Sequence, residues 1–582
     1  MNITQDFFEN PSHPLHRQYE ALRAYFYEKR SAKDVADQFG YSENSLYCFA
    51  SRFRKLLGKQ QMNDRFFAAV VVGRPATQHH NSVDQLIIAL RKKYLSVSDI
   101  KAIVDTQTAN VSETYIFNLL KREGFARLPR RSNLIKSQVQ KPTCIEAPSA
   151  ETLDMEPEIF NTAYAGLLCF LPYITAFGID KIIAASDFPE TKTIPKVQSI
   201  LSFVALKLSN IKRYSADDLW CMDRGAGLFA GLNVLPKAAW FSSYSHRVTR
   251  KMNINFLKEM HQLWQKKGWL SDTVNLDFVA VPYWGNDDST IENNWSGTRH
   301  KALPSILAAI AQEPDSGLIT YGDTTVRHNN EANVAVEFLD FYKQAGNQDL
   351  KYLVFDSKFT TYENLSKLDD NDVKFITIRR RGKKIVEDIE KLVAADWKKV
   401  RVRRSDGKTK QIKIYDTIIH IKAYGDKPIR QIAMTGHGKI KPALIITNDF
   451  DIKDSDIIEK YAKRWLVEKN ISEQTHFFHL NKVSSSMVIK VDFDLTMTIL
   501  AHNLYRLFAD SLESHQHLTA QSLYEKFICN HGSAAIDRET IKIQMKKKRN
   551  LPLLLTAMNQ FKKTKPSWLS SLDVIFEAAS NT

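Results

Sequence analysis

The chain has 582 residues, of which 43% are hydrophobic and 25% charged, a balance typical of folded proteins that excludes a mainly disordered or collagen-like chain. Lys and Arg outnumber Asp and Glu and give a formal net charge of +16, so polyanions, and nucleic acid first among them, are the expected partners. The five cysteines show no Cys-x-x-Cys spacing, which argues against a disulfide framework or a thiolate zinc site and favours a reducing, cytoplasmic compartment.

Residues 1–60 are predicted to form three short helices. A tight turn at Gly40 separates the second helix from the third, whose outer face carries Arg52 and Arg54. A short helix, a turn and a following amphipathic helix make up the helix-turn-helix pattern, in which the last helix fits the major groove of DNA. We therefore predict a DNA-binding unit here, with an ordinary three-helix bundle for protein contacts as the alternative.

Residues 80–131 repeat this pattern. Ser98 and Ser112 are the predicted caps of its second and third helices, and the third helix carries Lys121 and Arg122 on its outer face. Two such groups in tandem, both ending in basic helices, strengthen the prediction of DNA binding.

The next part of the chain is predicted to be a linker at 132–150 and a helical region at 151–270. Within that region, 160–179 is a 20-residue stretch without a charge, which is long enough to cross a bilayer. Pro172 and several polar side chains interrupt it, so we expect a buried core helix and no membrane partner. A membrane-associated protein is the alternative.

After this region the pattern changes to alternating strands and helices. Strands are predicted at 276–282, near Trp295, and at 317–323, 352–359, 373–380 and 442–449, with helices at 326–345, 361–368 and 454–480. This order predicts a mixed α/β domain made of 271–380 and 441–485, interrupted by a β-rich insertion at 381–440. Residues 486–582 are predicted to be helical. The whole chain is thus expected to be a multidomain α/β protein.

Three carboxylates in the α/β domain stand out. Asp277 lies within the first apolar strand, Asp356 ends a later one, and Glu468 lies on the long helix. A carboxylate among Leu, Phe and Val is costly to bury without a partner, and a backbone hydrogen bond or a structural ion pair is the ordinary explanation. Two strand carboxylates and a helical one can also converge on two divalent metals about 3.5–4 Å apart, which clamp the reacting oxygens of a phosphodiester. Such hard oxygen ligands suit Mg²⁺, with Mn²⁺ as a substitute.

On the long helix, Tyr461, Arg464 and Glu468 are spaced so that they share one face. They offer a carboxylate for metal, a guanidinium for phosphate and a phenol beside them, the groups that processing of a DNA end requires. This spacing resembles the Tyr-x-x-Arg-x-x-x-Glu signature of one branch of the bacterial insertion-sequence transposases of the DDE type. The segments NLDFVAVPYWG and VFDSKF resemble the first and second Asp motifs of that family, and the resemblance covers about 270–485.

The resemblance implies an RNase H-like catalytic core in which Asp277, Asp356 and Glu468 hold two Mg²⁺ ions. It implies cleavage of DNA at the element's terminal repeats and strand transfer into target DNA, with Arg464 on a phosphate near the cleaved end and Tyr461 beside it. Relatives act as dimers or higher assemblies, so a homodimer or larger assembly on double-stranded DNA, associated with the nucleoid, is the expected active form.

The β-rich insertion carries the remaining candidates for DNA contact. Relatives use an aromatic residue of this region to hold a flipped base, and Trp397 is the Trp of this segment. Packing of Trp397 in the subdomain core is the alternative. The residues predicted to contact phosphates here are Arg379, Arg380, Arg401, Arg403 and Arg404.

The sequence departs from the family pattern at one position. The branch usually has a Lys seven residues after the Glu, where this chain has Thr475, and Lys469 and Lys482 are possible substitutes. Rival metal ligands also exist, and they are Glu473, Asp323, Asp287, Asp288 and the pair His476 and His479.

Two other functions fit the same features. One is a DNA-binding repressor or architectural protein whose catalytic fold is inert, which the retention of three carboxylates argues against. The other is a general nuclease of the same fold, which would cleave arbitrary DNA, whereas a transposase requires its own terminal repeats.

Overall fold

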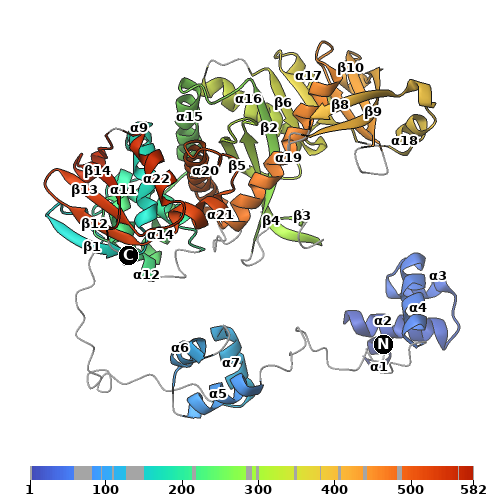
Figure 1. Cartoon of the computed structure of the whole chain (residues 1–582). Helices are drawn as coiled ribbons and strands as arrows, with labels where there is room; N and C mark the ends of the chain where they lie inside the picture. Colours follow the sequence, from blue (N-terminus) through green and yellow to red (C-terminus); the bar gives the residue numbers. More distant parts are fainter. Residues whose placement is uncertain are drawn as a thin grey trace. The chain divides into compact units, whose positions relative to one another are not determined.

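The structure is a computed structural model of the chain. It describes residues 3–57, 81–92, 95–107, 111–125, 150–212, 218–283, 291–296, 301–346, 350–380, 382–403, 408–436, 442–480, 488–561 and 563–580. The chain divides into two units, Met1–Thr143 and Cys144–Thr582. Figure 1 shows the helices and strands of each unit.

The first helical group of the N-terminal unit has the three predicted helices, α2 Pro14–Phe26, α3 Ala32–Phe39 and α4 Glu43–Leu57. A further helix, α1 Ile3–Glu9, precedes them and was not predicted. The Ser31 hydroxyl accepts a hydrogen bond from the backbone N–H of Asp34 at 3.1 Å and so caps α3. Gly40 ends α3 with a φ of 69°, the left-handed conformation that glycine adopts at least cost. Val35 and Leu46 are buried between the helices, so this group has a small core of its own.

The second helical group contains α5 Asn81–Lys92, α6 Val97–Gln107 and α7 Glu113–Arg122. The Ser112 hydroxyl caps α7 as predicted, by accepting a hydrogen bond from the backbone N–H of Tyr115 at 3.1 Å. The predicted cap of α6 at Ser98 is wrong, because that residue already lies inside the helix. The Ser96 hydroxyl accepts from the backbone N–H of Asp99 at 3.2 Å, and the Asp99 carboxylate accepts from the backbone N–H of Ser96 at 3.1 Å. This reciprocal pair starts the helix earlier than the sequence pattern indicated.

The larger unit is built on a mixed sheet that has ten strands in the described part of the chain. They are β2 Thr273–Pro282, β3 Glu292–Ser296, β4 Lys301–Gln312, β5 Ile319–Val326, β6 Tyr352–Phe355, β7 Lys374–Ile378, β8 Lys398–Arg403, β9 Thr409–His420, β10 Pro428–Thr435 and β11 Ala443–Thr447. The order is β4-β2-β6-β7-β11-β10-β9-β8, with β3 and β5 paired to β4. β2, β6 and β7 are parallel to one another, whereas the other neighbours are antiparallel. The predicted mixed α/β character is therefore confirmed.

Two features of this sheet differ from the sequence-based expectation. The strand β4 is absent from the predicted elements, because its sequence, with four Ala and one Pro, has low strand propensity. It is also buried on both faces from Ser305 to Gln312, so it shows no alternation. The segment 381–440 is rich in strands as predicted, but it is no separate sheet. β8, β9 and β10 continue the main sheet through β11, because long-range pairing leaves no local mark in the sequence.

Helices cover both faces of the sheet. They are α15 Arg250–Lys266, η3 Glu331–Asn333, α16 Val334–Ala345, η4 Ser357–Phe359, α17 Tyr362–Asp369, α18 Lys383–Glu390, η5 Ala394–Asp396, η6 Lys422–Tyr424, α19 Asp454–His476 and α20 Val488–Asp510. On β5, Gly322 lies against α20 so closely that a Cβ would be 2.6 Å from the Ile499 side chain. The preceding residue, Tyr321, faces the other way and packs its ring against Phe338 of α16 at 5.4 Å. α20 and α16 therefore lie on opposite faces.

A second core joins the region before the sheet to the C-terminal region. It contains β1 Glu158–Thr162, η2 Ala165–Phe170, α9 Leu171–Ala176, α10 Ile179–Ala185, α11 Lys196–Leu208, α12 Asp218–Cys221, α13 Arg224–Ala230, α14 Ala238–Ser245, α21 Ala520–Leu523, η8 Tyr524–Ile528, β12 Gly532–Ile536, β13 Thr540–Met545, α22 Leu551–Asn559, η9 Ser567–Leu569 and β14 Asp573–Ala578. The strands form a four-stranded sheet in the order β1-β12-β13-β14. The prediction that 151–270 and 486–582 are helical is therefore wrong in part. β1 and β12 pair across most of the chain, which no local pattern reveals.

The uncharged stretch 160–179 is buried from Ala165 to Ile174, but it is not one helix. Its first residues belong to β1, and η2, α9 and α10 follow with a bend of 72° between Ala176 and Ile179. Gly178, with a φ of 69°, makes that bend. In the described part of the chain no single helix is long and apolar enough to span a membrane, and this bent pair alone passes the test of length and composition.

Candidate active site

Asp277 and Asp356 lie side by side on neighbouring parallel strands. β2 and β6 pair in parallel over three residues that end at Asn275 and Val354. Asp277 and Asp356 each follow two residues later, and the charges of both carboxylates act on the Tyr461 phenol, so they lie near one another. Phe278 of β2 and Phe359 of η4, which follow the two aspartates in the sequence, stack with ring centroids 3.8 Å apart and hold β2 against the segment after β6. The structure thus brings together the two strand carboxylates that the sequence singled out.

Each of these carboxylates accepts a hydrogen bond from the next backbone N–H. Asp277 Oδ1 accepts from Phe278 at 2.8 Å, and Asp356 Oδ1 accepts from Ser357 at 2.6 Å, where Asp356 caps η4. The side chain of Asp277 is 13% exposed and Asp356 is half-buried. The carboxylates are therefore held in place by the local backbone and are still partly accessible from outside.

The helix α19 crosses the same face and brings a cation to Asp277. Arg464 Nη1 donates to Asp277 Oδ2 at 2.8 Å, and the Arg464 side chain is only 6% exposed. One turn earlier, Lys460 Nζ donates to Thr273 Oγ1 at 2.9 Å and lies over the ring of Tyr352 at 4.3 Å. α19 is thus anchored to the starts of β2 and β6. This anchoring places Arg464, one turn further along the helix, beside Asp277. The sequence analysis missed Lys460, although its position four residues before Arg464 places it on the same face.

Tyr461 lies beside Arg464 and near both carboxylates. Its side chain is buried against β6 and β7, and the Arg464 guanidinium lies 5.4 Å from its ring. Burial, followed by the charges of Asp356 and Asp277, raises the pKa of Tyr461 to about 12, although Arg464 acts in the opposite direction. The phenol therefore stays protonated near neutral pH and serves as a packing and hydrogen-bonding group rather than a base.

The two arginines after β7 have different positions. Arg380 is exposed and donates to the backbone carbonyl of Ser357 at 3.3 Å, so its guanidinium lies beside Asp356. Arg379 is half-buried and donates to Gln431 Oε1 at 2.5 Å, within the sheet. Of this predicted pair, Arg380 is the one at the edge of the site.

The third predicted carboxylate belongs to α19. Glu468 lies on this helix one turn beyond Arg464, and its side chain is outside the described residues. The rival Glu473 approaches α20 instead, with its carboxylate 3.8 Å from His502 Nδ1. Among the side chains that the structure describes, no cluster of three or more His, Cys, Asp or Glu residues could hold a metal. The two aspartates supply hard oxygen donors that suit Mg²⁺ or Mn²⁺, and Glu468 stays a prediction.

Asp323, the rival strand carboxylate, is on the wrong face of the sheet. Asp323 pairs with Ala309 of β4, and Ala309 pairs in turn with Phe278 of β2, so these three side chains share one face of the sheet. Asp277 precedes Phe278 on the same strand and therefore points to the opposite face. There it accepts a hydrogen bond from Tyr321 at 3.1 Å. Asp323 therefore cannot share a metal with Asp277.

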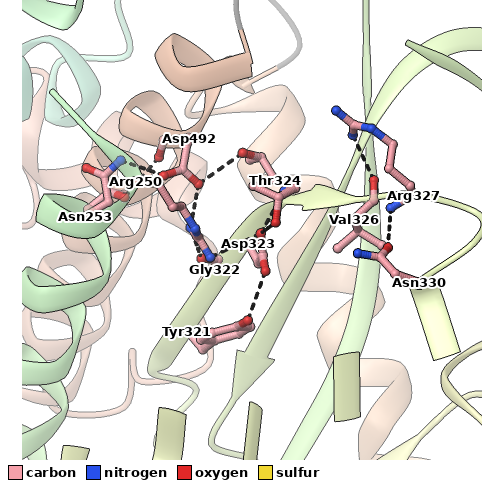
Figure 2. Close-up of polar contacts among 12 residues, drawn as sticks. Arg250, Asn253, Tyr321, Gly322, Asp323, Thr324, Val326, Arg327, Asn330 and Asp492 are labelled. Carbon is pink, nitrogen blue, oxygen red and sulfur yellow. Dashed lines mark hydrogen bonds and ion pairs between the residues drawn. The ribbon is translucent and has the colours of Figure 1, made fainter. Parts of the chain in front are cut away.

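Asp323 instead belongs to a buried polar cluster that joins α15, β5 and α20 (Figure 2). Arg250 contacts Asp323 at 3.1 Å and Asp492 at 2.6 Å, and Asp492 also accepts hydrogen bonds from Asn253 and Thr324. Burial raises the pKa of Asp492, and Arg250 with the two hydrogen bonds opposes that rise. These contacts explain both buried aspartates without a role in chemistry.

The other rivals do not come together either. His479 Nε2 lies 2.7 Å from Asn210 Oδ1, whereas His476 is exposed. Four candidates from the sequence lie outside the described residues, namely Asp287, Asp288, Arg404 and Lys482. Lys469 lies on α19, but its side chain is outside the described part. Thr475 lies near the C-terminal end of α19.

The ribbon of β8 and β9 presents a row of basic side chains. Lys399, Arg401 and Arg403 alternate along β8 and are exposed on one face, and Lys413 of β9 pairs with Lys399. The side chains between them, such as Val402, are buried under α19. The exposed face of β8 thus carries three basic side chains, a pattern that suits contact with phosphates, and the backbone N–H of Arg403 donates to Glu459 of α19 at 2.6 Å.

Trp397 makes the packing contact that was its alternative prediction. It is half-buried and packs against a small core of Ile389, Ala433 and Leu444 beneath α18. This contact follows from the apolar face that α18 presents to the sheet. Because part of the ring is accessible, a role for Trp397 in holding a flipped base stays a prediction.

The basic residues of the N-terminal unit are exposed as predicted. They are Arg52, Arg54, Lys121 and Arg122. The Arg54 guanidinium lies 5.2 Å from the ring of Phe26, and Arg122 lies 3.5 Å from Glu123. The four basic side chains are accessible to a polyanion, and Arg54 is held against the ring of Phe26.

Comparison with known proteins connects this site to one class. Residues 286–504 match the family model described as the transposase DDE domain, so this part of the chain is similar to transposases. The match includes Asp356 and α19 but begins after Asp277. Among solved structures, the chain is similar to the piggyBac transposase in its synaptic complex with hairpin DNA, with 11% identity, a TM-score of 0.33 and coverage of 70% of this chain and 84% of that chain. No curated protein sequence matches the chain.

Proposed function

We propose that this protein is a DNA transposase that cuts DNA at the ends of its element and joins them to target DNA by metal-dependent phosphodiester chemistry. The observation that carries the proposal is the meeting of Asp277 and Asp356 on parallel strands under Arg464 of α19. The match of 286–504 to the transposase DDE domain supports it independently.

The residues of the site have distinct roles in this proposal. Asp277 and Asp356, with Glu468 as the third ligand, hold two Mg²⁺ ions, and Mn²⁺ can substitute. Bound there, the ions activate the attacking hydroxyl and stabilise the leaving oxygen. Arg464 and Arg380 bind phosphates of the DNA end, because a guanidinium pairs with phosphate oxygens through two parallel hydrogen bonds. In this proposal, the mixed sheet that carries these residues is an RNase H-like catalytic core.

DNA is recognised by parts outside this site. The two N-terminal helical groups act as helix-turn-helix units that place Arg52, Arg54, Lys121 and Arg122 against double-stranded DNA at the terminal repeats. The basic row on β8 continues the contact with the backbone near the cut. A homodimer or larger assembly on two ends, in the cytoplasm and associated with the nucleoid, completes the proposal.

We expect the double variant Arg401→Gln with Arg403→Gln to weaken DNA binding uniformly across sequences. Each phosphate contact releases about one counterion on binding, so the loss of two contacts should reduce the magnitude of the slope of log affinity against log salt concentration by about 2. Lys398→Gln is the matched control, since this lysine is on the same strand but its Nζ is held by Asp454 at 2.7 Å on the other face. An unchanged slope in the double variant would remove β8 from the DNA interface.

The test of the proposed function is incubation with the DNA that flanks the protein's own gene and Mg²⁺, followed by mapping of the 3′ ends. The wild type should cut at the ends of the element, and Asp356→Ala should not. If both behave alike, the enzyme proposal fails, and a DNA-binding repressor or architectural protein remains. If the wild type cuts arbitrary DNA equally well, the protein is a general nuclease.

A further inference from the structure

The carboxylate of Asp277 has an ionic partner within the protein itself. One oxygen accepts from the backbone N–H of Phe278 at 2.8 Å, and the other accepts from Arg464 at 2.8 Å. Both side chains are largely buried, at 13% and 6% exposed. A close ion pair that is shielded from water is much less weakened by solvent than one at the surface.

This pair conflicts with metal binding. A divalent cation at Asp277 would bring a second positive charge next to the Arg464 guanidinium, which donates to Asp277 Oδ2 at 2.8 Å, and the two positive charges repel each other. Arg464 cannot yield by losing a proton, since a guanidinium stays charged in proteins. Asp277 therefore becomes fully available to a cation only when the Arg464 side chain finds another anion.

We propose that Arg464 holds Asp277 in a metal-excluding ion pair in the DNA-free protein, and that a DNA phosphate releases Asp277 by taking over the guanidinium. Arg464 is then a positioning residue that couples DNA binding to metal binding. This inference rests on the proposed function, because it uses Asp277 as a metal ligand. It adds a reason why the site would stay inactive on the free protein.

The surroundings allow this exchange without a change of fold. Lys460 and Ile457 anchor α19 one and two turns before Arg464, so the helix can keep its position while one side chain turns. Tyr461, which is buried beside the guanidinium, provides a fixed ring against which that side chain moves. Arg380, exposed next to Asp356, marks the side from which a phosphate can approach.

The first experiment measures Mn²⁺ binding to the full-length, DNA-free protein by titration calorimetry. Arg464→Gln should bind Mn²⁺ about tenfold more tightly than the wild type, which is within the usual range of coupling between two sites. Lys463→Gln is the matched control, because it removes a positive charge from the next residue of α19, where Lys463 pairs with Asp315 at 2.5 Å. This control should bind Mn²⁺ as the wild type does.

The second experiment needs no variant and therefore does not depend on the folding of Arg464→Gln. Mn²⁺ binding to the wild type is measured with and without a short DNA duplex, which should tighten the binding of Mn²⁺ about tenfold. Equal Mn²⁺ affinity with and without the duplex would overturn the coupling. Equal affinity of the DNA-free wild type and Arg464→Gln would overturn the ion-pair lock.

Asp277→Asn separates failure of this inference from failure of the proposed function. If Asp277→Asn abolishes Mn²⁺ binding and Arg464→Gln leaves it unchanged, the metal site stands and the lock is wrong. If Asp277→Asn binds Mn²⁺ as the wild type does, Asp277 is no metal ligand, and the lock and the proposed site fail together.

Discussion

Asp277→Asn is expected to reduce Mg²⁺-dependent strand cleavage by at least about 10³-fold while the protein stays folded. The amide has nearly the same size, and its oxygen can still accept a hydrogen bond from Arg464. It lacks the negative charge that a divalent cation requires, and the loss of one ligand removes several kcal/mol of stabilisation from the transition state. Cleavage of the element's end DNA, measured under single-turnover conditions, gives the ratio of rates.

Asp323→Asn is the matched control for this prediction. Asp323 is a buried aspartate of the same sheet, but it lies on the opposite face and contacts Arg250 at 3.1 Å. We expect its cleavage rate, corrected for the folded fraction, to stay within about tenfold of the wild type. A large loss in both variants, or in Asp323→Asn alone, would show that the position of Asp277 under Arg464 has no special role in the reaction.

The strand carboxylates of the site could be predicted because their local sequence marks them. Asp277 interrupts an apolar strand and Asp356 ends another, and parallel strands bring such positions to the same level. The helical face of Tyr461 and Arg464 could be predicted for a similar reason, since helical spacing alone places them together. Side-chain spacing within one element is local, so it survives in the sequence.

The partners of these residues could not be predicted, because they depend on contacts between distant segments. The ion pair of Arg464 with Asp277 joins a helix to a strand nearly two hundred residues away along the chain. The strand β4 and the pairing of β1 with β12 could not be predicted for the same reason, since their pairing is long-range and their local strand propensities are weak. Asp323 looked like a ligand until the register of β5 set it on the other face.

The cluster around Arg250 also depends on distant contacts, and it leads to the largest effect on stability that we expect. Asp492→Ala should lower the free energy of unfolding of the larger unit by about 3–5 kcal/mol. The aspartate side chain is 3% exposed, and its loss leaves the Arg250 guanidinium and the Asn253 amide without the oxygens to which they donate at 2.6 Å each (Figure 2). Thr324 loses an acceptor at 3.0 Å as well.

Urea unfolding followed by near-ultraviolet circular dichroism measures this effect, and Asp492→Asn is its control. Arg250 keeps Asp323 at 3.1 Å when Asp492 is replaced, so the expected cost of Asp492→Ala comes from buried donors that lose their acceptor and from lost packing. Asparagine keeps the volume and one acceptor oxygen, so Asp492→Asn should be more stable than Asp492→Ala. If Asp492→Ala costs less than about 1 kcal/mol, the cluster does not join α15, β5 and α20 energetically. If Asp492→Asn is no more stable than Asp492→Ala, the cost arises from the lost negative charge and not from unpaired donors.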